Sequence, residues 1–134
     1  MRRAAAAAGA SRRDVRLDGL QLAREVVDAL VDRQASDVVL LDLQGLSTFT
    51  DYFVIASADS ERQLRALVEA VDEVSASHDG SRRSNRPRWE GRNEDGWRLA
   101  DLGDTVVHIF AVEQRAYYNL EGLWRRAREV VHIQ

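Results

Sequence analysis

The stretch that decides the fold reads GWRLADLGDTVVHIF over residues 96–110 and continues as AVEQRAYYNLEGLW over residues 111–124. Its first half predicts two strands, residues 97–102 and 105–112, because aromatic and β-branched residues flank the turn at Gly103 and Asp104. Its second half predicts a helix over residues 115–128, broken near residues 119–122. Five of the nine aromatic residues of the chain lie here. No catalytic motif accompanies them, which favours a surface that binds a partner.

The rest of the chain predicts alternating helices and strands. Apolar residues at helical spacing predict a helix over residues 18–34, with Asp18 as its N-cap. Short apolar runs predict strands over residues 38–43, 51–57 and 89–91, and Asp95-Gly96 predicts a turn. Ser60 and Gln63 fit a capping box that starts a helix ending near residue 80. We therefore expect an α/β (α+β) fold with a mixed sheet of four to five strands flanked by helices.

Length and composition limit the class of protein. With 134 residues, the chain fits a flexible Arg/Ala-rich tail over residues 1–16 and a single domain over residues 17–134. The sequence contains no cysteine, which excludes disulfides, thiolate zinc sites and cysteine nucleophiles. No apolar run approaches the ~20 residues of a membrane span. The net charge of −3 gives no overall attraction to nucleic acid, although all nineteen basic residues are arginine and many lie in clusters.

Motifs for catalysis and cofactor binding are missing from the sequence. There is no G-x-G-x-x-G, no lysine for a phosphate-binding loop and no G-x-S-x-G. The three histidines are widely separated, and Asp101, Asp104 and His108 are more typical of a turn and a strand than of a metal site. The sequence therefore predicts no enzyme activity, no cofactor and no metal.

Individual aromatic and polar residues leave alternatives open. His108 lies between apolar neighbours on one strand face, which fits a buried structural histidine and a polar contact within a binding face about equally. Trp89 and Trp97 have polar sequence neighbours, and tryptophan is enriched at interface hot spots. Trp124 fits the core as well as a surface, because it stands at helical spacing from Leu120.

Several motifs together resemble one family. They are Asp51-Tyr52-Phe53-Val54-Ile55-Ala56-Ser57, Ser60 with Gln63, Glu90-Gly91, Gly96-Trp97 with Asp101, Val106-Val107-His108-Ile109-Phe110, and Arg115 through Tyr118 with Leu120-Glu121 and Leu123-Trp124. In this order and spacing, over about residues 20–128, the chain resembles the ribosomal silencing factor (RsfS, Iojap-like) family.

The resemblance implies a nucleotidyltransferase-like fold without transferase activity, and Ala58-Asp59-Ser60 indeed lacks the Gly-Ser pair of an active enzyme. It further implies binding to protein number fourteen of the large ribosomal subunit. Such binding blocks joining of the small subunit and lowers translation under nutrient limitation. Homodimers and a cytoplasmic, bacterial location are also implied. The acid-poor N-terminus weakly resembles an organelle transit peptide, which is the minor alternative.

From the residues and the resemblance we predict a partner-binding surface, with the arginine-rich loop as a candidate RNA contact. The predicted partner-binding residues are Trp97, Asp101, His108, Phe110, Tyr117, Tyr118 and Glu121, and the candidate RNA contacts are Arg82, Arg83 and Arg86. Two other functions stay open at this point: a residual nucleotidyltransferase, and a ribosome-associated RNA-binding module that acts through its arginine loops.

Overall fold

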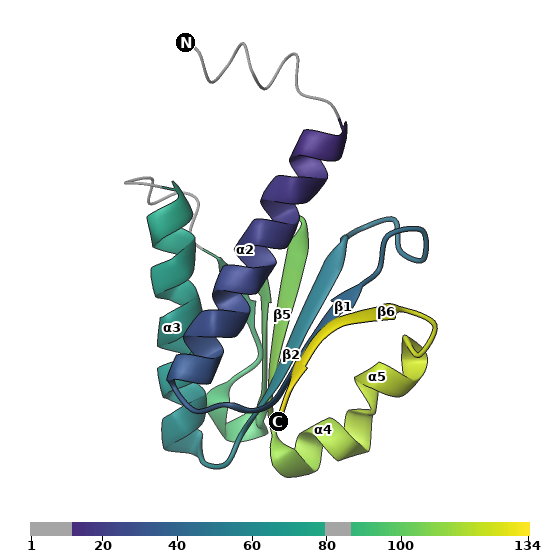
Figure 1. Ribbon diagram of the computed structural model, residues 1–134. Helices are drawn as coiled ribbons and strands as arrows, with labels where there is room; N and C mark the ends of the chain where they lie inside the picture. Colours follow the sequence, from purple (N-terminus) through teal and green to yellow (C-terminus); the bar gives the residue numbers. More distant parts are fainter. Residues whose placement is uncertain (1–11, 80–86) are drawn as a thin grey trace.

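The computed structural model describes residues 12–79 and 87–134, and the side chains of residues 19–77 and 87–134. A six-stranded mixed sheet forms the centre, with the strand order β3-β4-β5-β2-β1-β6. Helices α2 and α3 lie on one face of the sheet, and the short helices α4 and α5 lie on the other (Figure 1). The predicted α+β class is confirmed, but the sheet has one strand more than the four to five expected.

The elements are, in chain order, α2 (Arg12–Asp32), β1 (Ser36–Asp42), β2 (Tyr52–Ala58), α3 (Glu61–Asp79), β3 (Arg88–Glu90), the 3-10 turn η2 (Asn93–Asp95), β4 (Trp97–Asp101), β5 (Thr105–Ala111), α4 (Val112–Tyr118), α5 (Leu120–Leu123) and β6 (Arg128–Ile133).

The two central strands, β2 and β5, are parallel, and every other pair in the sheet is antiparallel. All seven residues of β2 and six of the seven in β5 are buried. Strands covered on both faces read as continuous apolar runs, and the sequence of β2 has this form. The chain between β2 and β5 includes α3, which supplies the crossover that a parallel pair requires.

The larger core lies between the sheet and helices α2 and α3. Its fully buried side chains include Leu30 of α2, Leu64 and Leu67 of α3, and Val54 and Ile109 of the sheet. Apolar residues recur every three or four positions along both helices, so each presents one apolar stripe to the strands. This core fixes the positions of the central strands, whose other faces form the candidate site.

The start of α3 confirms the predicted cap. The Ser60 Oγ accepts a hydrogen bond from the Gln63 backbone N–H at 3.0 Å. The Gln63 Oε1 accepts from the Asp59 N–H at 2.8 Å, one residue earlier than in a standard capping box. The Gln63 amide also donates to the carbonyl oxygens of Arg33 and Gln34, which ties the end of α2 to the start of α3.

The beginning of the first helix differs from the prediction. Helix α2 begins at Arg12, so Asp18 lies inside the helix and is not its N-cap. The helix extends beyond its apolar-periodic part because arginine and leucine are good helix formers. Residues 12–16 are therefore helical in the structure, whereas residues 1–11 of the predicted tail lie outside the described residues.

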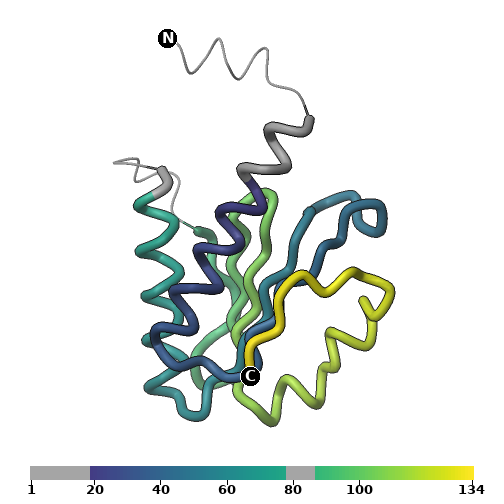
Figure 2. Tube along the Cα trace, in the orientation of Figure 1, coloured from purple at the N-terminus to yellow at the C-terminus, as the bar shows by residue number. Residues whose placement is uncertain are grey.

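The C-terminal region also differs from the prediction. The predicted helix over residues 115–128 is absent beyond Leu123, and the chain forms β6 instead, antiparallel to β1. Figure 2 shows this last segment, in yellow, running back along the sheet after the short helices. Strand β6 adds a strand to the edge of β1, and its β-branched residues Val130, Val131 and Ile133 suit a strand.

Candidate partner-binding face

The sheet face that α2 and α3 do not cover carries a continuous set of aromatic rings. The set, called the aromatic face below, consists of Phe49, Phe53, Trp97, His108, Phe110, Tyr117, Tyr118 and Trp124. Side chains alternate between the two faces of a strand, so the odd-numbered residues of β4 and the even-numbered residues of β5 point the same way. Trp97 pairs with Phe110 across β4 and β5, and Leu99 pairs with His108.

Every ring of the aromatic face contacts at least one other. The shortest centroid distances are 4.5 Å for Trp97–Tyr118, 4.6 Å for Phe53–His108, 5.1 Å for Tyr117–Tyr118, 5.2 Å for Trp97–Phe110 and 5.6 Å for Phe53–Trp124. Phe49 extends the set from the loop before β2, at 6.4 Å from Phe53. Such pairs each contribute about 0.5–1.5 kcal/mol beyond their area burial. The rings therefore form one packed layer, with side chains contributed by β2, β4, β5, α4 and the residue after α5.

Exposure rises from the centre of this layer to its rim. Phe110, His108 and Phe53 are at most 4% exposed, and the side chains of Trp97 and Trp124 are half-buried. At the rim, Tyr118 is 44% exposed, Phe49 66% and Tyr117 79%. The rim also includes Leu123 at 76%. Large apolar side chains left this open on one side of a small protein mark an interaction surface.

His108 occupies the buried centre as a neutral side chain. The indole N–H of Trp97 donates to His108 Nδ1 at 3.3 Å, so the ring proton is on Nε2. This Nε2 is buried and has no hydrogen-bond partner among the described residues. Burial lowers the pKa of His108 from 6.5 to about 4. Of the two interpretations left open by the sequence, burial supports the structural one.

Phe110 likewise lies beneath the surface, at 0% exposed. It stacks under Trp97, and Tyr118 covers it from the side of α4. Of the seven predicted contact residues, His108 and Phe110 therefore support the face and do not form its outer surface. The predicted residues that form the outer surface are Tyr117, Tyr118 and the exposed part of the half-buried Trp97.

A buried arginine holds the two short helices against the sheet. The Arg115 guanidinium donates to both Glu121 carboxylate oxygens, at 3.2 and 2.6 Å, to the Asp37 carbonyl oxygen at 2.6 Å and to Ser57 Oγ at 2.8 Å. Its side chain is only 10% exposed. Between the helices, Asn119 adopts a left-handed backbone with φ of 48°, which gives the sharp change of direction. Glu121, predicted as a partner contact, is therefore one half of an internal ion pair.

Asp101, another predicted contact, and Trp89, which was not in the predicted set, have local structural roles. Asp101, exposed at the end of β4, accepts the Gly103 backbone N–H at 2.9 Å and so stabilises the β4–β5 turn. Trp89 lies against the opposite, helix-covered face, where its indole donates to Asp72 Oδ1 at 2.8 Å. The tryptophans thus divide between the two faces of the sheet. Because side chains alternate along β4, Asp101 lies on the same sheet face as Trp97, at the opposite end of the strand.

The predicted contacts did not include Phe49, Phe53 and Trp124 of the aromatic face, or Leu123 at its rim. Phe53 lies in a predicted strand and Leu123 in a motif of the family, but neither is a predicted contact, and Phe49 precedes that strand in the chain. Phe49 and Leu123 are among the most exposed large apolar residues of the described chain. A large apolar residue inside a polar loop, as in residues 45–50, is the signal that could have identified Phe49. The candidate RNA contacts Arg82, Arg83 and Arg86 lie outside the described residues.

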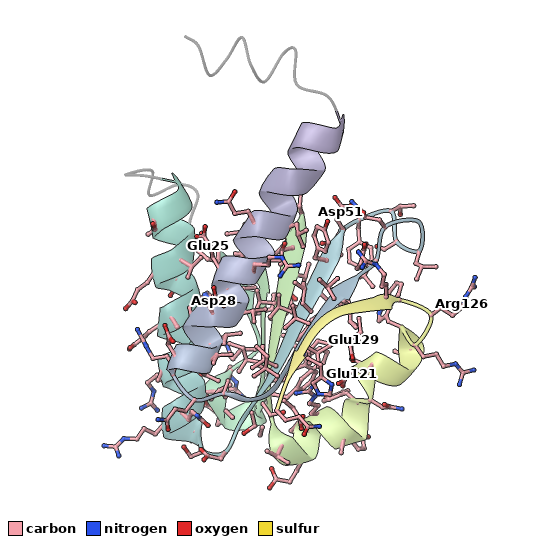
Figure 3. The ribbon with its side chains drawn as sticks, in the orientation of Figure 1. Glu25, Asp28, Asp51, Glu121, Arg126 and Glu129 are labelled. Carbon is pink, nitrogen blue, oxygen red and sulfur yellow. The ribbon has the colours of Figure 1, made fainter. Side chains whose placement is uncertain are left out.

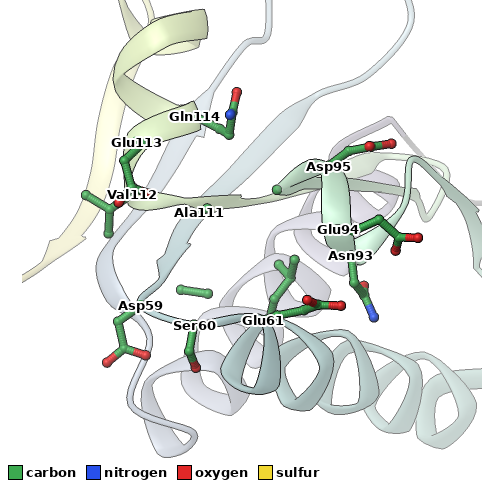
Figure 4. A pocket seen from close by; sticks show the side chains of 13 residues that line it. Asp59, Ser60, Glu61, Asn93, Glu94, Asp95, Ala111, Val112, Glu113 and Gln114 are labelled. Atoms are coloured by element: carbon green, nitrogen blue, oxygen red, sulfur yellow. The ribbon is translucent and has the colours of Figure 1, made fainter.

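A cavity of about 570 Å³ lies where the parallel strands β2 and β5 end, lined in part by Gly96, Ala111 and the first residues of α4 (Figure 4). Crevices at such strand ends commonly bind nucleotides in α/β proteins. Here the described lining side chains include the carboxylates Asp59, Glu61, Glu94, Asp95 and Glu113, and no arginine, lysine or histidine. All charged side chains of this lining would repel a phosphate. No three His, Asp or Glu side chains of the described residues converge as a metal site, and none of the described helices is long and apolar enough to span a bilayer.

Comparison with known proteins identifies the family. The family model described as "Ribosomal silencing factor during starvation" matches residues 17–134. Ribosomal silencing factor RsfS of Halalkalibacterium halodurans is 42% identical over 111 residues, which cover 83% of this chain and 89% of that protein. The mouse protein "Mitochondrial assembly of ribosomal large subunit protein 1" is 33% identical over 99 residues, 74% of this chain and 43% of its own.

A solved structure shares the fold. A crystal structure of a Chromobacterium violaceum protein superposes with a TM-score of 0.70 at 31% identity, covering 79% of this chain and 85% of that one. The family match spans the whole sheet and both short helices, so it includes every described residue of the aromatic face. This chain belongs to the ribosomal silencing factor family, and it is a regulatory protein and not an enzyme.

Proposed function

We propose that this protein represses translation by binding the large ribosomal subunit through its aromatic face and blocking the small subunit from joining. The partner on the large subunit is ribosomal protein number fourteen, and repression serves cells short of nutrients. The observation on which the proposal rests is the exposed rim of Phe49, Tyr117, Tyr118 and Leu123 around a packed aromatic centre. A bound protein can block the small subunit sterically without catalysis, and an interface of standard size, ~800 Å² per partner, is sufficient for such binding.

Two further observations support this target. The family description refers to ribosomal silencing during starvation, and the mouse relative is named for assembly of the large ribosomal subunit. The acidic cavity at the ends of β2 and β5 is unsuited to nucleotide phosphates, which argues against the residual nucleotidyltransferase. Because its relatives include ribosomal silencing factors of Halalkalibacterium halodurans and Bacillus subtilis, we place the protein's action in a bacterial cytoplasm.

A subunit-joining experiment tests the proposal. Purified small and large subunits are mixed with the protein at a Mg²⁺ concentration that favours joining and then separated by sedimentation. We expect the protein to sediment with the large subunit and the fraction of joined ribosomes to fall with protein concentration. Full joining, with no protein on the large subunit, would overturn the proposed function.

Single-residue variants test the surface itself. Tyr117→Ala removes an exposed rim ring, and a hot-spot tyrosine is worth about 2 kcal/mol, or roughly 30-fold in affinity. Because Tyr117 is 79% exposed, its removal should leave stability within about 0.5 kcal/mol. Glu69→Ala, an exposed change on α3 across the sheet, is the matched control and should bind normally. Equal binding by both variants to ribosomal protein number fourteen would exclude this part of the aromatic face from the interface.

A further inference from the structure

A tight turn next to the aromatic face presents two adjacent arginines. The backbone N–H of Ala127 donates to the carbonyl oxygen of Trp124 at 2.8 Å, which closes a four-residue turn after α5. Arg125 and Arg126 occupy its two central positions, where side chains point away from the body of a turn. Trp124 and Ala127, the two ends of the turn, both pack against the core on the aromatic side of the sheet. The arginines are therefore exposed residues on a fixed support.

The charges of this turn are not neutralised within the fold. Arg125 and Arg126 are exposed, and neither forms an ion pair with another described residue. Figure 3 shows Arg126 pointing away from the molecule. Arg128, two residues on, is 72% exposed and reaches Asp42 at 3.3 Å. By contrast, Arg115 forms an internal ion pair with the Glu121 carboxylate, at 2.6 Å.

The arginine turn and the acidic cavity lie at opposite ends of the central strands. Arg128 pairs with Asp42 in the sheet, so the turn lies at the end of β1 that leads into the β1–β2 loop. The cavity with five carboxylates lies at the opposite end of β2, after Ala58. The strand ends beside the turn also carry Asp42, Asp51 and Asp104, so the positive charge belongs to the turn itself, whereas every charged side chain that lines the cavity is a carboxylate. A phosphate is therefore attracted by the exposed arginines of the turn and repelled by the carboxylates of the cavity.

The position of the turn relates it directly to the proposed interface. Arg125 is two residues from Leu123, a rim residue of the aromatic face, and consecutive Cα atoms are about 3.8 Å apart. A partner in contact with Leu123 therefore brings its neighbouring surface within reach of both guanidinium groups. Arginine presents several N–H donors in a planar fork that matches phosphate oxygens.

We propose that Arg125 and Arg126 bind backbone phosphates of ribosomal RNA beside the protein that occupies the aromatic face. This inference rests on the proposed function and adds a second, nucleic-acid partner to the same site. RNA is favoured over an acidic protein surface because Arg125 and Arg126 are adjacent, exposed and not paired with a described carboxylate. Phosphate recognition of this kind fixes orientation without reading sequence.

Salt dependence of binding tests the inference. Loss of two phosphate contacts should make the slope of log K against log salt less steep by ~1.4–1.8. Between 50 and 200 mM salt the wild type should then lose about seven to twelve times more affinity for purified large subunits than the double variant R125Q/R126Q. The matched control R24Q/R62Q removes two exposed arginines from α2 and α3, and its slope should equal that of the wild type.

A second binding measurement, with isolated ribosomal protein number fourteen, distinguishes contacts with RNA from contacts with protein. Isolated ribosomal protein number fourteen should bind R125Q/R126Q as tightly as the wild type, because no phosphate is present. An unchanged salt slope on large subunits, or an equal loss of affinity for the isolated ribosomal protein, would overturn the inference. Either result leaves the proposed function intact, whereas failure of the wild-type protein to bind large subunits at any salt concentration would remove the proposed function itself.

Discussion

Replacing Arg115 tests whether the aromatic face depends on the two short helices being held in place. Arg115→Met keeps the length of the side chain but removes the charge that bridges α4, α5, β1 and β2. It leaves the Glu121 carboxylate without its partner, and it leaves the Asp37 carbonyl and Ser57 hydroxyl without a donor.

The expected cost follows from burial. Breaking a fully buried ion pair costs about 3–5 kcal/mol. The Glu121 side chain is 37% exposed and can regain water, so we expect a loss of about 2–3 kcal/mol in the free energy of unfolding. For a chain of this size that corresponds to a fall in Tm of roughly 8–12 °C. Arg115→Lys should cost about half as much, since one ammonium cannot serve the same set of acceptors.

Urea unfolding monitored by tryptophan fluorescence measures the cost, and hydrogen exchange of residues 112–123 locates it. We expect these amides to lose protection before those of β2 and β5, because the core beneath α2 and α3 is untouched. Arg62→Met, at an exposed position on α3, is the control and should change stability by less than about 0.5 kcal/mol. Equal stability of the two variants, with unchanged exchange in α4 and α5, would refute the role assigned to Arg115.

Two further predictions concern His108 and Asn119. Burial lowers the pKa of His108 to about 4, below its unfolded value of 6.5, so the unfolded state binds a proton between these pH values and the folded state does not. The stability contributed by neutral His108 is complete above pH 6.5 and falls by roughly 3 kcal/mol as the pH drops toward 4. Urea unfolding midpoints measured from pH 7 to 4.5 should show this loss. His108→Phe should make the midpoints less dependent on pH. Asn119→Ala places a Cβ-bearing residue without a side-chain amide at φ of 48° and should cost about 1 kcal/mol by thermal unfolding, whereas Asn119→Gly should stay within about 0.5. A pH profile unchanged by His108→Phe, or equal melting of the two Asn119 variants, would contradict these assignments.

Much of the fold could be predicted from local patterns. The strands around Val54 and Val107 and the cap at Ser60 followed from apolar runs and from one polar pair, because these signals are contained within a few residues. The last strand was missed because residues 128–133 become a strand only by pairing with β1, a contact between positions about ninety apart in the chain. The early start of α2 was missed because helix formers extend a helix beyond its apolar stripe.

The candidate site was only partly predictable. The predicted contacts Trp97, Tyr117 and Tyr118 lie together on one surface, and their binding to a partner stays a prediction. Periodicity places His108 and Phe110 on that same face, but it does not say how deeply they lie, because depth depends on what α4 packs over them. Phe49 joined the set only through its contact with Phe53.

The sequence by itself determined the family, the α+β class and the presence of an aromatic segment without catalytic groups. Residue types, their order and their spacing are sufficient for those conclusions. The tertiary structure alone decided which aromatic residues support the surface and which form it, and it brought the Arg125–Arg126 turn next to Leu123 at the rim. The physical reason is that exposure and the pairing of charges are properties of packing between distant segments, and no local pattern contains them.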